Sequence, residues 1–171
     1  MRSITRVSLV IAASAALVGS LALPASAADT VATVTVPAGQ LTISAPASAD
    51  LGTVAPGSPI SAALGTVTVS DLRAGVQGWD AQVNMSDFVG TNTATVIAAA
   101  SATYTPGTAA ESGTSTVTPS AQTGLATAKT VQAATGVSGN NTAAWDADLS
   151  FTAPADALAD TYTATLTHSV L

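Results

Sequence analysis

The sequence predicts an all-β protein, a single antiparallel β-sandwich of roughly eight to ten short strands. Residues 145–151 and 162–170 alternate between apolar and polar side chains, which is the two-residue period of half-buried strands. Charged residues make up only 8% of the chain, against about 25% in typical soluble domains. Threonine and serine must therefore keep the surface wet, and β-branched threonine suits the outward face of a strand.

The two C-terminal alternating runs are predicted to form the hairpin that closes the core. In W-D-A-D-L-S-F (145–151) the odd-numbered residues are apolar, and in Y-T-A-T-L-T-H-S-V-L (162–171) the threonines share one face. The stretch between them, 153–160, contains proline and two aspartates that favour a turn. The expected core comprises Trp79, Val83 and Met85 against Trp145, Leu149, Phe151, Tyr162 and Leu166.

The N-terminal residues 1–27 have the pattern of a cleaved signal peptide. Two arginines precede an apolar run, 7–23, and Ala25-Ser26-Ala27 gives a small-x-small cleavage site. We expect cleavage before Ala28, or one residue later, rather than an uncleaved anchor, because the run is short. No other stretch approaches the ~20 apolar residues of a membrane-spanning helix, so the mature domain, 28–171, is expected to have no span.

The first half of the mature domain alternates strands with loops rich in glycine and proline. The expected elements are a strand at 31–36, a turn at 37–39, a strand at 41–44, a loop at 45–58 that includes a possible brief strand at 51–54, an ambiguous piece at 59–64, and strands at 65–72 and 79–86. Because a glycine-rich connection, 73–78, separates the last two strands, they are predicted to form a hairpin with a medium-length loop.

The second half is less clearly patterned. Residues 95–104 are alanine-rich and could start a helix, but a strand is favoured because the neighbouring segments are strands. A turn is expected at 107–113, a strand at 115–119, and a strand with irregular chain at 121–137. G-V-S-G-N-N, 136–141, is the strongest loop signal in the chain.

The charge balance excludes some partners. The whole chain has a net charge of −6; without residues 1–27 two basic and ten acidic residues remain, so the mature chain carries 2 − 10 = −8. Two basic residues cannot neutralise a phosphate backbone, which excludes nucleic acid, and anionic membrane surfaces are disfavoured for the same reason. The chain has no cysteine, so an exported form would depend on packing and not on disulfides.

The sequence contains no convincing catalytic or metal site. His168, the only histidine, lies between Leu166 and Val170 on an apolar row, which favours a structural imidazole near the sandwich edge over an acid-base role. Asp80, Asp146 and Asp148 could supply paired carboxylates or Ca²⁺ ligands, but they lack a defining spacing and are interpreted as solvated strand acids. No nucleophile elbow, phosphate loop, zinc spacing or dinucleotide motif is present, so neither an enzyme nor a cofactor is expected.

The two tryptophans, Trp79 and Trp145, each begin an alternating run on the apolar side. A tryptophan in this place can anchor the core or stack on a sugar ring, and the apolar rows favour the core.

Three stretches resemble secreted actinobacterial proteins of the WxL-domain type. They are G-W-D-A-Q-V-N-M-S-D-F (78–88), G-N-N-T-A-A-W-D-A-D-L-S-F (139–151) and Y-T-A-T-L-T-H-S-V (162–170), and the upstream 35–54 is similar too. Two Trp-x-Leu motifs define that family. The first aligns with Trp79-Asp80-Ala81 and the second with His168-Ser169-Val170, so only one tryptophan is kept. Candidate motif positions are thus Trp79, Asp80, Trp145, Tyr162 and His168.

The resemblance implies a cell-surface module that attaches non-covalently to the Gram-positive wall, with peptidoglycan or its stem peptides as ligand. Stem-peptide amines would suit the aspartates better than the anionic wall polymers would. The alternative is a structural or adhesive subunit that assembles with other surface proteins through strand edges. A hydrolase would require the carboxylates to converge in a cleft.

Overall fold

A computed structural model describes residues 26–171, and nearly all its regular structure is antiparallel strand, which confirms the predicted all-β sandwich-like class. The predicted signal peptide lies outside the described residues except for Ser26 and Ala27. The chain divides into two compact units, one that ends at Val34 and one of Thr35–Leu171.

The elements are β1 (Leu41–Ser44), β2 (Pro59–Asp71), β3 (Trp79–Met85), β4 (Phe88–Gly90), β5 (Val96–Ile97), the 3-10 turn η1 (Ala99–Ser101), β6 (Thr103–Pro106), β7 (Ala110–Pro119), β8 (Gln122–Thr123), β9 (Lys129–Thr152), β10 (Tyr162–Thr163) and β11 (Leu166–Val170).

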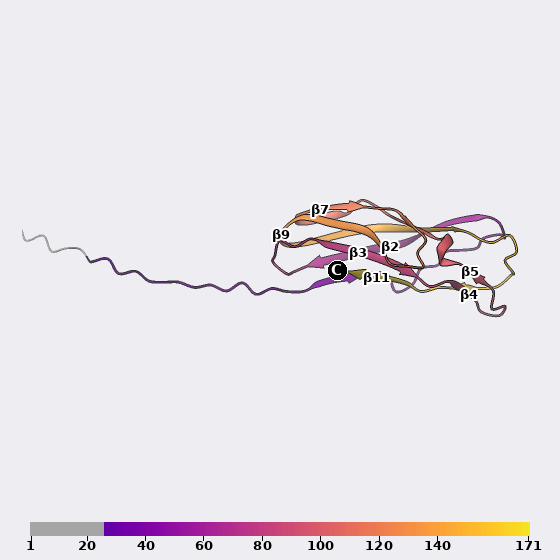
Figure 1. Cartoon of the computed structure of the whole chain (residues 1–171), viewed down its shortest axis with the longest axis horizontal. Helices are drawn as coiled ribbons and strands as arrows, with labels where there is room; N and C mark the ends of the chain where they lie inside the picture. The colour runs from indigo at the N-terminus through magenta and orange to yellow at the C-terminus, as the bar shows by residue number, and fades with distance from the viewer. Residues whose placement is uncertain (1–25) are drawn as a thin grey trace, which may run out of the picture. The chain divides into compact units, whose positions relative to one another are not determined.

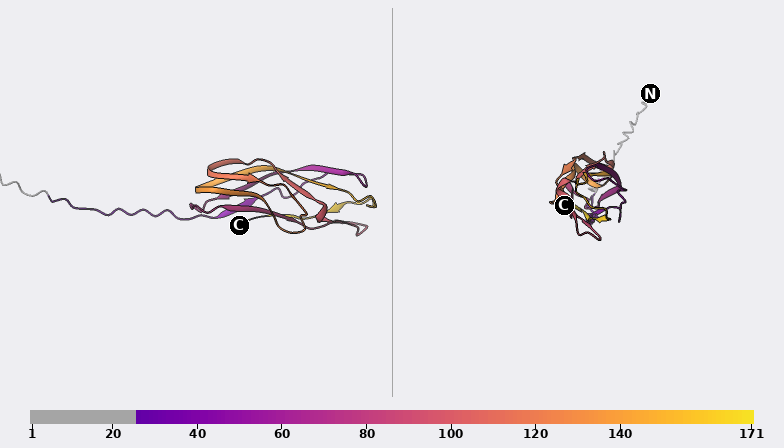
Figure 2. Two further views of the ribbon diagram at one scale, coloured as in Figure 1. Left: turned by 45° about the horizontal axis from the view of Figure 1, so that its top comes forward. Right: turned by 90° about the vertical axis from the view of Figure 1, so that its right-hand side faces the viewer.

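The 24-residue strand β9 is the centre of the main sheet (Figure 1). β6 and β7 pair along one side of it, and β2 and β3 pair along the other. β1 extends the sheet next to β2, and β11 extends it next to β3. β1 and β11 then lie beside each other, so the strands curl into a nearly closed barrel, which the end-on view of Figure 2 shows. A small second sheet has the order β10-β4-β5.

Glycines bend the hairpin of β7 and β9 in its middle. Gly136 and Gly139 of β9 have φ values of 61° and 74°, and Gly113 of β7 has 85°. The β7–β9 register shifts beside Gly113. Glycine adopts this left-handed conformation at little cost, so the strands bulge without losing their pairing. The predicted loop at 136–141 is therefore wrong, because these residues lie inside β9.

Both predicted hairpins are wrong in their pairing. Residues 145–151 lie in β9 against β2 and β6, whereas β11 pairs with β3. β2 and β3 do not pair either, because they follow each other along the same side of β9. The alternation identifies each strand's two faces correctly, but a face pattern does not specify which strand lies alongside.

Three local predictions also differ from the structure. Residues 31–36 form no strand, and Val31, Val34 and Val36 are 90%, 88% and 75% exposed. Residues 95–104 form neither one strand nor an α-helix, but the short strand β5, the turn η1 and the start of β6. The predicted turn at 107–113 is partly strand, because β7 already begins at Ala110.

The core contains most of the side chains expected there. Trp79, Val83, Met85, Trp145 and Leu149 are buried, and Phe151, Tyr162 and Leu166 are partly buried against them. Tyr104 and Leu125 were not predicted, yet both are fully enclosed. No helix among the described residues is long and apolar enough to cross a membrane.

Candidate binding cleft

A cleft of about 780 Å³ opens between two irregular segments, 46–54 and 157–165. The first segment follows β1, and the second leads through β10 to β11. Side chains from β2, β3, β4, β5, β9 and β11 form its floor: Ile60, Leu64, Met85, Phe88, Ile97, Leu149, Phe151 and Leu166. We refer to this hollow as the apolar cleft.

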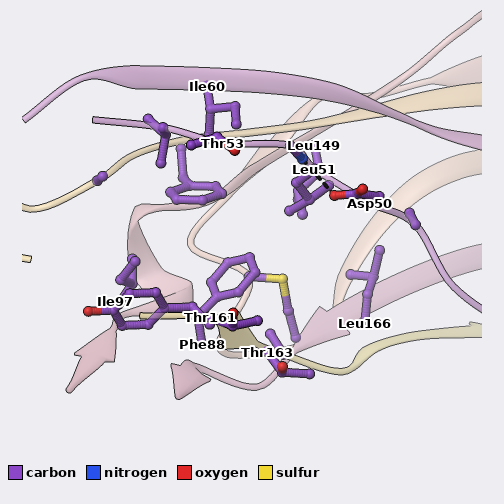
Figure 3. A pocket seen from close by; sticks show the side chains of 18 of the residues that line it. Asp50, Leu51, Thr53, Ile60, Phe88, Ile97, Leu149, Thr161, Thr163 and Leu166 are labelled. Atoms are coloured by element: carbon purple, nitrogen blue, oxygen red, sulfur yellow. Dashed lines mark hydrogen bonds between the residues drawn. The ribbon is translucent and has the colours of Figure 1, made fainter. Parts of the chain in front are cut away.

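The alternation of the strands explains the apolar floor. Leu149 of β9 and Met85 of β3 are 3% exposed, on rows that face inward. The rings of Phe88 and Phe151 pack with centroids 4.9 Å apart at 37°, which brings β4 against β9. In Figure 3, Leu51 and Leu166 lie on opposite sides of the cleft. An apolar side chain that enters would therefore contact Leu51 of the wall and Leu166 of the floor.

The segment 46–54 carries unpaired backbone groups. None of its N–H or C=O groups makes a backbone–backbone hydrogen bond with another described residue. Its one hydrogen bond is local, from the Gly52 amide to Asp50 Oδ1 at 2.9 Å. Most of 46–54 is exposed, so these groups face water and are open to an added partner. This wall can therefore hydrogen-bond an added chain.

Asp160 fixes the opposite rim. Its Oδ2 accepts from the backbone amides of Asn92 and Thr93, both at 2.8 Å, and from Thr93 Oγ1 at 2.9 Å. Desolvation of the carboxylate raises its pKa, but these hydrogen bonds together hold the pKa well below its usual range. A side chain at Gly90 would meet Asp160 Oδ2 at 2.6 Å, so a larger residue there would have to displace this carboxylate. The Asp160 carboxylate thus holds the rim in place through hydrogen bonds, and it is not free to act as an acid.

His168 lies in the wall of the cleft, beside the core. Its Nε2 is buried and has no hydrogen-bond partner among the described residues. Its ring meets Tyr104 edge to face at 5.7 Å, and the Tyr104 hydroxyl accepts from Trp145 Nε1 at 3.2 Å. Burial lowers the pKa of His168, so the neutral imidazole is favoured. Among the described residues, the hydrogen bond expected for a structural imidazole is absent at Nε2.

A separate polar network lies at the far end of β2. Trp79 Nε1 donates to Asn141 Oδ1 at 3.1 Å, and Asn141 Nδ2 donates to Asp71 Oδ2 at 3.3 Å. Arg73 donates to both oxygens of Asp71, from Nε and from a terminal nitrogen, each at 2.9 Å. The Arg73 hydrogen bond is the main cause that lowers the pKa of Asp71, and it outweighs the raising effect of burial. Because Trp79, Asn141 and Asp71 are buried, this network stabilises the join between β2 and β3.

The structure brings some predicted site residues together and separates others. The Trp79-Asp80-Ala81 and His168-Ser169-Val170 triplets lie on adjacent strands, with Ala81 opposite Val170. Of the five candidate motif positions, Tyr162 and His168 line the cleft, and Trp145 is hydrogen-bonded to Tyr104, whose ring packs against His168. Trp79 is buried in the other network, and Asp80 points to solvent.

The three candidate carboxylates do not converge. Asp146 and Asp148 lie on the part of β9 next to β2, whereas Asp80 lies opposite Ala133, far along the same strand. Asp146 accepts a hydrogen bond from Thr66 Oγ1 across the β2–β9 ladder. Among residues 26–171, no group of three or more acidic or histidine side chains could hold a metal ion. These acids therefore lie as the solvated strand acids that the alternation predicts.

The sequence analysis did not identify Asp71, Tyr104 and Asn141 as buried residues. For two of them, the alternation along the strand could have indicated burial. Asp71 has the parity of Val67 and Val69, and Asn141 has the parity of Ala143 and Trp145, so both fall on buried rows. No such signal marks the cleft, because 46–54 and 157–161 have no period and the alternation of 162–165 does not show which segment lies opposite. Comparisons of this chain with protein-family models, with curated proteins and with solved structures find no match.

Proposed function

We propose that this chain is a secreted, non-enzymatic cell-surface domain that binds an extended peptide segment in the apolar cleft. One observation carries the proposal: an apolar floor lies beside a wall, 46–54, whose backbone groups are unpaired. An extended peptide suits both features, because its backbone can hydrogen-bond the wall while alternate side chains enter the floor.

The ligand that we propose is the peptide part of the Gram-positive wall, and the association is non-covalent. Glycan is a weaker candidate, because sugar binding favours an exposed ring and Trp79 and Trp145 are 3% and 2% exposed. The cleft lining holds Asp50 and no lysine or arginine, so its rim suits a peptide that carries an amine. The WxL-type resemblance supports the wall as the source of such a peptide.

The secreted and non-enzymatic parts of the proposal rest on separate observations. Secretion is supported by the basic, apolar and small-x-small pattern of residues 1–27. A binding role is supported by the surroundings of His168, whose ring packs against Tyr104 and whose Nε2 meets no carboxylate within hydrogen-bonding distance among the described residues.

A second candidate function is that of a structural or adhesive subunit that assembles through protein–protein strand contacts. It is favoured by the exposed, strand-patterned valines of residues 31–36, which occur in the same chain as the unpaired wall of the cleft.

Co-sedimentation of the mature protein with purified Gram-positive walls tests wall binding. Ala49 lines the cleft on an exposed stretch, so Ala49→Trp should fill the cleft with little effect on folding. Ala126→Trp is the matched control, because Ala126 is also exposed and lies outside the lining. We expect the wild type and Ala126→Trp to sediment with walls and Ala49→Trp to stay in solution. Equal sedimentation of both variants, or none of the wild type, would contradict wall binding through the cleft.

A further inference from the structure

We propose that the apolar cleft, when no wall peptide fills it, also accepts the segment 31–36 of a second copy of this chain, added as a strand along 46–54. This inference rests on the proposed function, because it requires the cleft to accept an extended segment. It identifies the partner as the chain itself, so that each copy donates one segment and accepts another.

The donor segment has the pattern of a strand but no strand partner among the described residues. In V-A-T-V-T-V, Ala32, Val34 and Val36 fall on one face, and Val31, Thr33 and Thr35 fall on the other. Val34 and Val36 are 88% and 75% exposed. Isolated exposed apolar residues are ordinary, but an alternating row of them on an unpaired segment indicates a surface that becomes covered.

The acceptor matches the donor in two respects. Apart from the Gly52 N–H, which is bonded to Asp50, the wall 46–54 offers backbone N–H and C=O groups without a protein partner to a second extended backbone. The floor, with Leu51 on one side and Leu166 on the other, offers apolar contact to the Val34 and Val36 side chains (Figure 3). A strand added at this place would satisfy backbone groups and bury valines at once, which is the mode of β-augmentation.

A second copy is a better donor than the same chain. Residues just before β1 are fixed, because Gly39 N–H donates to the Leu72 carbonyl at 2.7 Å and Leu72 N–H donates to the Gln40 carbonyl at 2.9 Å. A turn at 37–39 would return the chain along β1. β2 lies on one side of β1 and β11 on the other, so that position is already occupied. Donation between copies avoids this obstacle and is head-to-tail, so it can continue from copy to copy.

Charge sets the conditions under which assembly should appear. Each mature copy carries 2 − 10 = −8, so copies repel one another. Salt screens such repulsion and leaves apolar burial intact. Association should therefore strengthen as the salt concentration rises, which distinguishes it from ion-pair assembly.

Cysteine cross-linking tests the contact directly, because the chain has no cysteine of its own. Two single variants of the mature protein, Val34→Cys and Ala49→Cys, are mixed under mild oxidation. We expect a disulfide-linked heterodimer from this mixture and much less from Val34→Cys mixed with Ala126→Cys. Equal yields in the two mixtures would overturn the proposal. The double variant V34C/A49C tests insertion of the segment into its own chain. If it forms an intrachain disulfide while the mixture gives no dimer, the proposal is overturned in favour of self-insertion.

Sedimentation velocity over a range of concentrations measures self-association and tests whether the apolar face of the donor segment, 31–36, is required for it. Val36→Asp should weaken association by about tenfold or more, because it places a charge against the floor. Thr35→Asp, with the same charge on the opposite face, should change it much less. A wild type that stays monomeric at high salt, or equal effects of the two variants, would overturn the inference. If the wild type stays monomeric while Ala49→Trp still abolishes wall binding, the inference fails and the proposed function stands. If both assays fail, both proposals fall.

Discussion

The indole Nε1 of Trp145 donates a hydrogen bond to the hydroxyl of Tyr104 at 3.2 Å, and both side chains are at most 2% exposed. The bond joins β9 to β6 inside the core. Because Tyr104 also meets His168 edge to face at 5.7 Å, one line of contacts leads from the deepest tryptophan to the wall of the cleft. Changes to this line should therefore alter stability in ways that depend on pH.

Replacement of Tyr104 by phenylalanine should destabilise the fold by about 1–3 kcal/mol, because it leaves the buried Trp145 N–H unpaired. Chemical denaturation at neutral pH measures the loss. Tyr162→Phe is the control, since the Tyr162 hydroxyl donates at 2.8 Å to the Leu158 carbonyl at an exposed site, where water can replace it. Its cost should stay below about 1 kcal/mol. Equal costs for the two variants would contradict the assignment.

Alkaline pH should weaken the fold through the same tyrosine. Burial raises the pKa of Tyr104 from 10.0 to about 12, although the hydrogen bond from Trp145 partly lowers it. The folded state then holds its proton where the unfolded chain has lost it, so the contribution is full below pH 10.0 and is lost as the pH rises toward about 12. Unfolding free energies from about pH 8 to about pH 12 should therefore fall more steeply for the wild type than for Tyr104→Phe. Parallel curves would sink this prediction.

As the pH falls, protonation of His168 should reduce the stability of the fold before protonation of any carboxylate does. Burial lowers the pKa of His168 from 6.5, so the unfolded chain takes up a proton first, and stability falls as the pH drops below about 6.5. The variant His168→Gln cannot gain this charge, because an amide does not take up a proton in this range. Its stability should stay level in the window just below pH 6.5, as followed by thermal melts at closely spaced pH values. A variant that loses as much as the wild type there would exclude His168 as the cause.

The sequence predicts well which side chains of a strand face the core, but it predicts poorly which strands pair. Parity places Trp145 and Leu149 inside and Asp146 and Asp148 outside, because alternation depends only on the local backbone. Which strands pair depends on contacts distant in sequence: β2 and β3 both pair with β9 and not with each other, and β11 pairs with β3 and not with β9.

The glycines of β9 produced a wrong loop prediction for a physical reason. A positive φ at Gly136 or Gly139 can end a strand or bend it, and the residue type is the same in both cases. The cleft could not be predicted at all, because the segment 46–54 carries no periodic pattern and meets 157–165 only through the folding of the strands between them.

Arg73 should stabilise the fold only while Asp71 is charged. The hydrogen bond from Arg73 is the main cause of the lowered pKa of Asp71. The stability that this pair contributes is therefore present above pH 3.8 and is lost as the pH falls below that value. Arg73→Leu should cost about 1–3 kcal/mol at neutral pH, and the difference from the wild type should shrink at low pH. Lys129→Leu is the control, because the one ion pair among the described residues joins Arg73 and Asp71. A difference that stays constant with pH would refute the ion-pair explanation.

Two glycines of the bend separate backbone strain from steric overlap. Gly139 has a φ of 74°, and a Cβ added there would have nothing within 4 Å, so Gly139→Ala should cost about 1–2 kcal/mol from the left-handed conformation alone. Gly113 has a φ of 85°, and a Cβ there would overlap the Asn140 carbonyl oxygen. Gly113→Ala should therefore cost about 1–3 kcal/mol more, because the β7–β9 ladder must shift beside the buried Asn141. Denaturant titration of the two variants decides the matter: equal losses would mean that the strands relax freely at the bend, and that the glycines are needed for conformation and not for close approach.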